Sequence, residues 1–151
     1  MLMDKYPIHG SKYFDVREFV DSKTFAMLGA RAEILIDPKT VRIVDKLREI
    51  AASPLYLNNW HTNGKRRACG YRAHWEKQGG DLSQHRCGRA ADPRSLTYTP
   101  KKLFEMVMDH RIEFFELGLT RIEDLKYTPT WLHLDCAPVL IKPGEFLIVK
   151  P

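Results

Sequence analysis

The chain has 151 residues, a length that suits one domain and can bury a core without disulfide or metal support. Hydrophobic residues make up 44% of it and charged residues 28%, which is ordinary globular usage and excludes a disordered or low-complexity chain. No apolar run is long enough to cross a membrane. We therefore expect one domain over residues 1–151.

The formal net charge is +5, with basic residues spread among acidic ones. The densest basic group is Lys65, Arg66 and Arg67, followed by Arg72. A mild positive balance favours polyanionic partners such as nucleic acid, anionic lipid or the acidic polymers of a bacterial wall. No nucleic-acid-binding motif accompanies the basic group, and a solvated loop explains it equally well. Nucleic acid is therefore only a minor hypothesis.

The three cysteines are Cys69, Cys87 and Cys136, an odd number without a CxxC pair. This pattern argues against a disulfide framework and against a four-cysteine zinc ribbon. Residues 1–16 lack the basic start and the apolar run of a signal peptide. We expect synthesis in the cytoplasm, with any target outside it reached by another route.

The first part of the chain carries two helix-start signals. Asp15, with Glu18 three residues later, resembles a capping box that opens a short helix. Asp37 before Pro38 is the second signal, and it precedes apolar residues at helical spacing. These are Val41, Val44, Leu47 and Ile50. We expect an amphipathic helix of about 13 residues there.

The rest of the chain is expected to contain four strands and one further helix. Residues 55–60 predict a strand, and the glycine- and arginine-rich residues 61–80 predict a long loop. A second helix is expected to begin at Thr99 and Pro100 and to end at Gly118. Strands are predicted at 118–124, 130–136 and 146–149, the first two as a hairpin. The expected class is α+β, a small single domain with helices packed on a central, mainly antiparallel sheet.

Residues 82–92 carry the most specific chemistry. His85 and Asp92 are seven residues apart in the sequence, and Gly88 between them lets the chain turn. An imidazole nitrogen and a carboxylate oxygen so placed can bind one ion, and zinc accepts both at about 2.0 to 2.2 Å. Small residues at 90 and 91 allow the backbone to pack closely beside such a site.

The same segment resembles the SxHxxGxAxD motif of the D-alanyl-D-alanine metallopeptidase superfamily, which has a hedgehog-type fold. The matching positions are Ser83, His85, Gly88, Ala90 and Asp92. That superfamily takes a third ligand from a histidine on a later strand beside an aromatic residue, and Trp131 and His133 fit this pattern. The resemblance implies a zinc ion held by His85, Asp92 and His133.

A second element, Gly70-Tyr71-Arg72, resembles the GYR element of the same superfamily. Its arginine points into the cleft and stabilises the charge that develops on the attacked carbonyl oxygen, so the resemblance gives this role to Arg72. The similarity runs in order and spacing from about Ile34 to Asp135 and covers most of the chain.

The chain departs from the pattern at the general base. A hydrolase of this kind needs a group that takes a proton from the attacking water and passes it to the leaving amine. Many members carry an acid three residues before the third ligand, where this chain has Thr130. Glu123, on the neighbouring predicted strand, is the preferred substitute. Asp135 is the other candidate and serves equally well as a structural carboxylate; without either, the protein holds zinc and cleaves nothing.

Other metal-binding residue types have simpler explanations. Lone histidines are more often surface or core residues than ligands, which applies to His9, His61, His74 and His110. Cys87 and Cys136 lie near ligands in sequence, but strand alternation points Cys136 away from His133 and Asp135, so we expect both thiols to be packing residues.

The expected function is a zinc metallopeptidase that cuts a D-amino-acid-containing bond of the peptidoglycan stem peptide, as an endolysin or a D-Ala-D-Ala carboxypeptidase. The resemblance points to a phage or prophage protein that reaches the wall after holin release or as a virion component with assembly partners. The alternative is a catalytically degenerate virion or wall-binding protein that retains the fold. A third and weaker hypothesis is nucleic-acid binding through residues 65–72.

Overall fold

The computed structural model describes residues 5–151. Its first part is helical: α1 (Val16–Phe19), α2 (Ser22–Leu28), the 3-10 helix η1 (Gly29–Leu35) and α3 (Pro38–Ala51). The predicted capping box is confirmed, because Asp15 accepts from the first turn and the Glu18 side chain accepts from the Asp15 backbone. The predicted helix after Asp37 is confirmed as α3. Helix α2 and η1 were not predicted.

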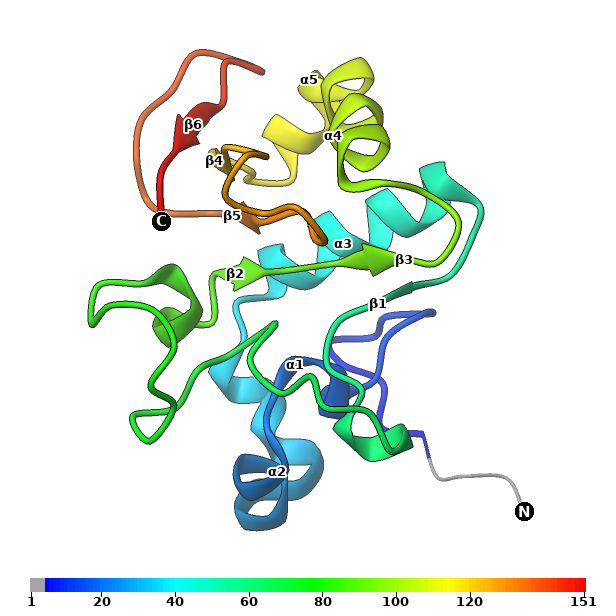
Figure 1. The fold of residues 1–151 in the computed structure, drawn as a ribbon, viewed down its shortest axis with the longest axis vertical. Coiled ribbons are helices and arrows are strands. Elements are labelled where there is room, and N and C mark those ends of the chain that lie inside the picture. The colour runs from blue at the N-terminus through cyan, green and yellow to red at the C-terminus, as the bar shows by residue number, and fades with distance from the viewer. Residues whose placement is uncertain (1–4) are drawn as a thin grey trace.

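Short strands form two sheets. Strands β1 (Leu55–Tyr56) and β3 (Arg94–Ser95) pair antiparallel. The larger sheet has the order β2-β5-β4-β6, with β2 (Ala90–Ala91), β4 (Arg121–Glu123), β5 (Leu134–Asp135) and β6 (Leu147–Val149). Strand β5 is antiparallel to both of its neighbours, and β6 runs parallel to β4. The architecture is α+β with a mainly antiparallel sheet, as expected (Figure 1).

Several predicted boundaries were wrong. The strand predicted at 55–60 ends at Tyr56, and the 3-10 helix η2 (Trp60–Thr62) follows it. The predicted second helix is two helices, α4 (Pro100–Asp109) and α5 (Arg111–Glu116). They are separated because His110 leaves the helical dihedral range, with φ −114° and ψ 26°. Of residues 61–80, those after η2 form neither helix nor strand, as predicted.

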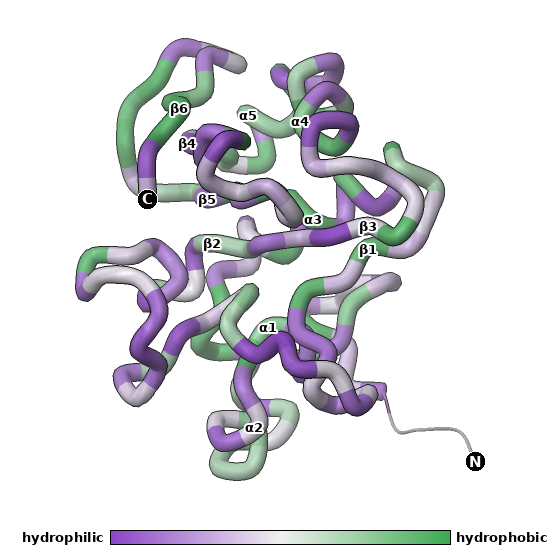
Figure 2. Tube along the Cα trace, in the orientation of Figure 1, coloured by the Kyte–Doolittle hydropathy of each residue, from purple (hydrophilic) through white to green (hydrophobic). Residues whose placement is uncertain are grey.

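One hydrophobic core joins the helices to the sheet. Helix α3 contributes Val41, Ile43, Val44 and Leu47, and it passes behind β2 and β3 (Figure 1). The inward face of the larger sheet contributes Ile122 and Leu134, both fully buried. Figure 2 shows that β6 is hydrophobic along its length, whereas β3 is hydrophilic. Within residues 5–151, no helix combines the length and apolar character that a membrane span needs.

The opposite face of the larger sheet carries the polar residues. Arg121 lies opposite Asp135 in the β4–β5 register, and Ile122 lies opposite Leu134. Because successive side chains alternate between faces, Arg121 and Glu123 project from the face opposite the core, together with Asp135. This face is where the candidate site lies.

Candidate metal centre

Three elements place the candidate ligands. His85 lies in the 3-10 helix η3 (Gln84–Cys87), whose N-cap Ser83 accepts a hydrogen bond from the His85 backbone. Asp92 directly follows β2, and His133 directly precedes β5. Strands β2 and β5 pair antiparallel with Ala91 opposite Leu134, so the next positions, Asp92 and His133, face each other across the ladder.

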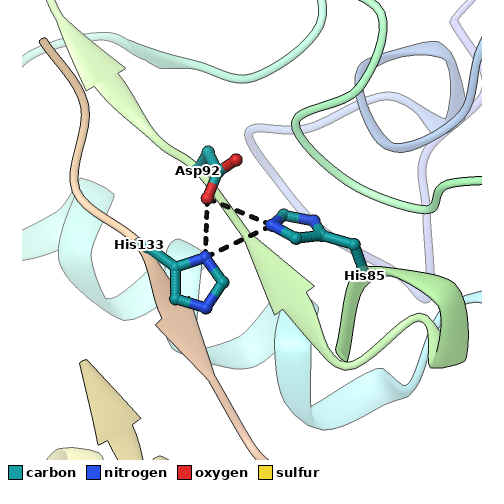
Figure 3. Close-up of side chains that lie close together, drawn as sticks. All are labelled: His85, Asp92 and His133. Carbon is teal, nitrogen blue, oxygen red and sulfur yellow. Dashed lines mark hydrogen bonds and ion pairs between the residues drawn. The ribbon is translucent and has the colours of Figure 1, made fainter. Parts of the chain in front are cut away.

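The three ligand atoms converge on one point (Figure 3). Nδ1 of His133 lies 2.8 Å from Oδ1 of Asp92, and Nε2 of His85 lies 3.2 Å from each of those atoms. A tetrahedral ion with bonds of about 2.0 to 2.1 Å separates its ligands by about 3.3 to 3.4 Å. The observed triangle is therefore a few tenths of an ångström tighter, and all three side chains are buried.

The remaining ring nitrogens are held by acceptors. Nδ1 of His85 donates to the carbonyl oxygen of Gly70 at 2.7 Å, and Nε2 of His133 donates to Oδ2 of Asp135 at 3.0 Å. With the protons placed there, the neutral rings direct lone pairs at one another and at the Asp92 carboxylate. Such a donor set needs a positive charge between its members. Metal-binding histidines typically donate their other ring N–H to an acceptor, as both of these rings do. The residues therefore fit a bound metal ion.

The pKa values of the three candidate ligands are shifted by their burial and by their contacts with neighbouring charges. Burial lowers the pKa of His85. Burial would also lower the pKa of His133, but hydrogen bonds and charges from Asp135 and Asp92 outweigh it and raise that pKa to about 10. Burial would raise the pKa of Asp92, but the two imidazoles outweigh it and hold the pKa below its ordinary value. The cluster favours a positive charge, supplied by a proton on His133 or by a cation.

Asp92 is fixed by the segment that precedes the motif. Its backbone N–H donates to the Cys69 carbonyl at 2.8 Å, and its own carbonyl accepts from Nη2 of Arg66 at 3.0 Å. Its second carboxylate oxygen, Oδ2, accepts from Nη2 of Arg72 at 3.3 Å. Arg72 in turn donates through Nε to the Ala68 carbonyl at 2.8 Å. The arginine predicted from the GYR element thus lies directly beside the ligand cluster.

Glu123 enters the same site from β4. Its backbone N–H donates to the His133 carbonyl at 3.3 Å, and its side chain lines the cleft that contains the three ligands. Burial raises the pKa of Glu123, and the nearby Asp92 carboxylate acts in the same direction. A raised pKa makes the carboxylate a stronger proton acceptor than an exposed glutamate.

Asp135 is placed differently. It is fully buried, and its carboxylate accepts from Arg121, from His133 and from the backbone of Ala137. These contacts use both oxygens, so Asp135 orients His133 and balances charge. Of the two roles that the sequence left open for Asp135, the structural one agrees with this geometry.

A cleft of about 480 Å³ gives access to the ligands. Besides the residues already named, it is lined by residues from the glycine-rich loop, η3, the β4–β5 connection and the end of the chain. These include Gly79, Gly80, Gln84, Tyr127, Trp131 and Lys150. The predicted long loop therefore forms one wall of the site.

The other candidate ligands lie elsewhere. Among residues 5–151, the three predicted ligands form the one group of histidine, cysteine or acidic side chains close enough to hold an ion. His9 bonds the Ile36 carbonyl and His110 bonds Glu113. Cys87 is exposed, and Cys136 is buried 3.6 Å from the Thr40 hydroxyl. The predicted packing role of Cys136 agrees with this burial, whereas the same prediction was wrong for Cys87, which is exposed.

Sequence reasoning missed two contributors. Arg66 holds Asp92 from a position interpreted as part of a solvated basic group. Arg121 pairs with Asp135, and its alternation with Glu123 on one predicted strand was the available signal.

Fold and site together define a small α+β protein with a candidate mononuclear metal centre in an open cleft. Comparisons with protein-family models, with curated proteins and with solved structures found no match. The functional assignment therefore rests on the residues of this chain.

Proposed function

We propose that the protein is a zinc-dependent peptidase that hydrolyses a peptide bond of the peptidoglycan stem peptide, as a phage-type lysin or virion component. The observation that carries the proposal is the convergence of two histidine nitrogens and one aspartate oxygen within 3.2 Å of one another, in a cleft open to a peptide. The motif resemblance at residues 83–92 supports the choice of substrate.

The donor set favours zinc among the common ions. Two imidazoles and one carboxylate with an accessible cleft match the three protein ligands and open position of catalytic zinc. Calcium and magnesium prefer oxygen ligands. Iron(II) also binds two histidines and one carboxylate in some enzymes, so metal analysis is the first test of the proposal.

His85, Asp92 and His133 would hold the ion, which when bound supplies an electrophile that acidifies water and polarises the scissile carbonyl. Glu123 accepts the proton that the attacking water loses and passes it to the amine nitrogen as the carbon–nitrogen bond breaks. Arg72 provides positive charge at the edge of the ligand cluster, where negative charge develops on the carbonyl oxygen. The products are a carboxylate and an amine.

The residues behind the ligands maintain this arrangement. The Gly70 carbonyl fixes the tautomer of His85, and Asp135 fixes that of His133. Arg121 neutralises Asp135, which would otherwise be a buried, uncompensated charge.

Metal analysis and zymography of the purified protein test the proposal together. We expect about one zinc per chain and clearing of peptidoglycan, with both lost in His133→Ala. The matched control is His74→Ala, which removes an exposed histidine outside the cleft and should retain both properties.

Two outcomes contradict the peptidase. Stoichiometric zinc without clearing, together with retention on cell walls, supports the degenerate wall-binding alternative. A protein prepared without chelators that contains no zinc contradicts the metal centre itself.

A further inference from the structure

Arg121 lines the cleft, and its pairing with Asp135 leaves part of its guanidinium exposed there. It lies on β4, two residues before Glu123 and on the same face of the sheet. Its side chain lines the cleft that holds the three candidate ligands. In the β4–β5 register it lies opposite Asp135, which fixes its location relative to His133.

The guanidinium is held rigidly by one edge. Nε lies 2.8 Å from Oδ1 and 3.1 Å from Oδ2 of Asp135, and Nη2 lies 2.9 Å from Oδ2. Nη1 of Arg121 makes no hydrogen bond within residues 5–151. The Arg121 side chain keeps 27% of its surface exposed, whereas that of Asp135 keeps none. Asp135 therefore orients the guanidinium from its buried edge, and the N–H groups on the exposed edge can still donate to another acceptor.

Strand geometry gives the separation between this group and the proposed base. Two residues along a strand span about 6.6 to 6.8 Å. An extended peptide covers the same length in about two residues. A peptide whose scissile bond lies beside Glu123 can thus bring a group one or two residues away to Arg121.

The charge around the cleft indicates which kind of substrate group would bind at Arg121. The lining side chains include the cations Arg72, Arg121 and Lys150 and the carboxylates Asp92 and Glu123. The buried Asp135 brings the side-chain carboxylates to three, which equals the number of side-chain cations. Counted over these side chains, a divalent ion in the ligand cluster would leave two positive charges in excess, which favours an anionic substrate.

We propose that Arg121 forms a carboxylate-binding subsite, so that the preferred substrate is a peptide with a free carboxylate one or two residues from the scissile bond. The inference rests on the proposed peptidase for its location but makes a separate statement about binding. Arginine suits the role because its planar group can bond Asp135 on one edge and still donate to a second carboxylate. Arg121 is a specificity residue, whereas Glu123 acts on the reacting atoms.

Matched peptides test the inference without depending on turnover. The probes are two pairs of the stem peptide L-Ala-γ-D-Glu-L-Lys-D-Ala-D-Ala, one with the glutamate α-carboxylate free or amidated, the other with the C-terminus free or amidated. Binding is measured by calorimetry to Glu123→Gln loaded with zinc, which retains the ligands but lacks the proposed base. We expect the acid form of at least one pair to bind about tenfold or more tightly than its amide.

Variants of Arg121 assign the preference. Arg121→Gln, made in the same Glu123→Gln background, should reduce the acid-to-amide ratio to near one, and Arg121→Lys should restore part of it because the charge is kept. Lys101→Gln removes an exposed cation outside the cleft and should leave the ratio unchanged. Zinc content and thermal unfolding of each variant identify any loss of folding. If Arg121→Gln does not fold, the Arg121→Lys variant and the peptide pairs still decide the question.

The results separate this inference from the proposed function. Equal binding of acid and amide in both pairs, or binding of neither, overturns the carboxylate subsite even if the wild type clears peptidoglycan. A strong acid preference that Arg121→Gln abolishes supports the subsite even if the wild type hydrolyses no peptide. An acid preference that persists in Arg121→Gln overturns the assignment to Arg121.

Discussion

Nε2 of His133 donates to Oδ2 of Asp135 at 3.0 Å, while Nδ1 of the same ring lies 2.8 Å from Oδ1 of Asp92. The imidazole thus lies between two carboxylates. Asp135 accepts the ring proton on Nε2, and Asp92 lies beside Nδ1, which carries the lone pair. Asp135 carries this role because Arg121 compensates its charge from the adjacent strand. Ligand orientation in this protein therefore depends on pairing between β4 and β5.

This relationship predicts the effect of Asp135→Asn. An amide can still accept from His133, but it no longer stabilises the ring by charge and it leaves Arg121 without its counter-ion. We expect zinc affinity to fall about 10- to 100-fold. Competition titration with a chromogenic chelator measures the change. Asp109→Asn, at an exposed position at the end of α4, is the control and should bind zinc as the wild type does; equal affinities in both variants would contradict the role of Asp135.

Glu123→Gln separates catalysis from metal binding. The amide cannot accept a proton, so we expect kcat on peptidoglycan fragments to fall by about 10² to 10⁴-fold. Zinc stoichiometry should stay at the wild-type value, because Glu123 is outside the ligand triangle. Release of new amino groups measures the rate. A variant that retains most of its activity would remove Glu123 as the base.

Short sequence patterns predicted the parts of the structure that depend on residues close together in the chain. The capping box at Asp15 and Glu18 and the ligands near Gly88 follow from spacing along the chain. The pairing of Asp92 with His133 could be inferred only through resemblance, because it depends on a β2–β5 ladder of two residues on each side. Strand β2 is Ala90–Ala91, which has little β propensity and is formed by its long-range partner.

The predicted strands were longer than the observed ones, again because long-range pairing decides where a strand begins and ends. Alternating apolar residues at 130–136 reflect burial on both sides of β5, and only Leu134 and Asp135 pair as a strand. The role of Arg121 was missed because an ion pair across two strands depends on register, which hydrophobic alternation alone does not fix at a short hairpin. The pattern of helix and strand signals predicted the fold class, and long-range pairing determined the electrostatics of the site.

A pH-dependent contribution to stability is expected from Glu18, far in sequence from the ligands. Burial raises the pKa of Glu18 to about 7 from its ordinary value of 4.5, and the Asp15 carboxylate adds to the effect. A raised pKa means that the folded state holds the proton more tightly. The contribution to stability is therefore complete below about pH 4.5 and is lost as the pH rises through about 7.

Comparison of the wild type with Glu18→Gln isolates this contribution. Glutamine keeps an acceptor for the capping box but does not titrate. Between pH 4.5 and 7.5 we expect the wild type to lose on the order of 2 kcal/mol of unfolding free energy relative to the variant. Urea denaturation at several pH values measures both curves. Parallel curves would show that Glu18 titrates at the same pH in the folded and unfolded chains.

Gly88 couples the metal motif to the core through backbone conformation. Its φ is +67°, so a side chain at this position would strain the backbone. A Cβ there would also collide with the Leu35 carbonyl oxygen. Gly88→Ala should therefore cost about 2 kcal/mol or more of unfolding free energy, and it should weaken zinc binding because Gly88 ends the helix that carries His85. Gly80→Ala is the matched control, since nothing lies within 4 Å of a Cβ at that position. Urea denaturation measures both variants, and we expect Gly80→Ala to stay within about 0.5 kcal/mol of the wild type. Equal stability of the two variants would mean that η3 can shift away from Leu35, and the position of His85 would then not depend on this contact.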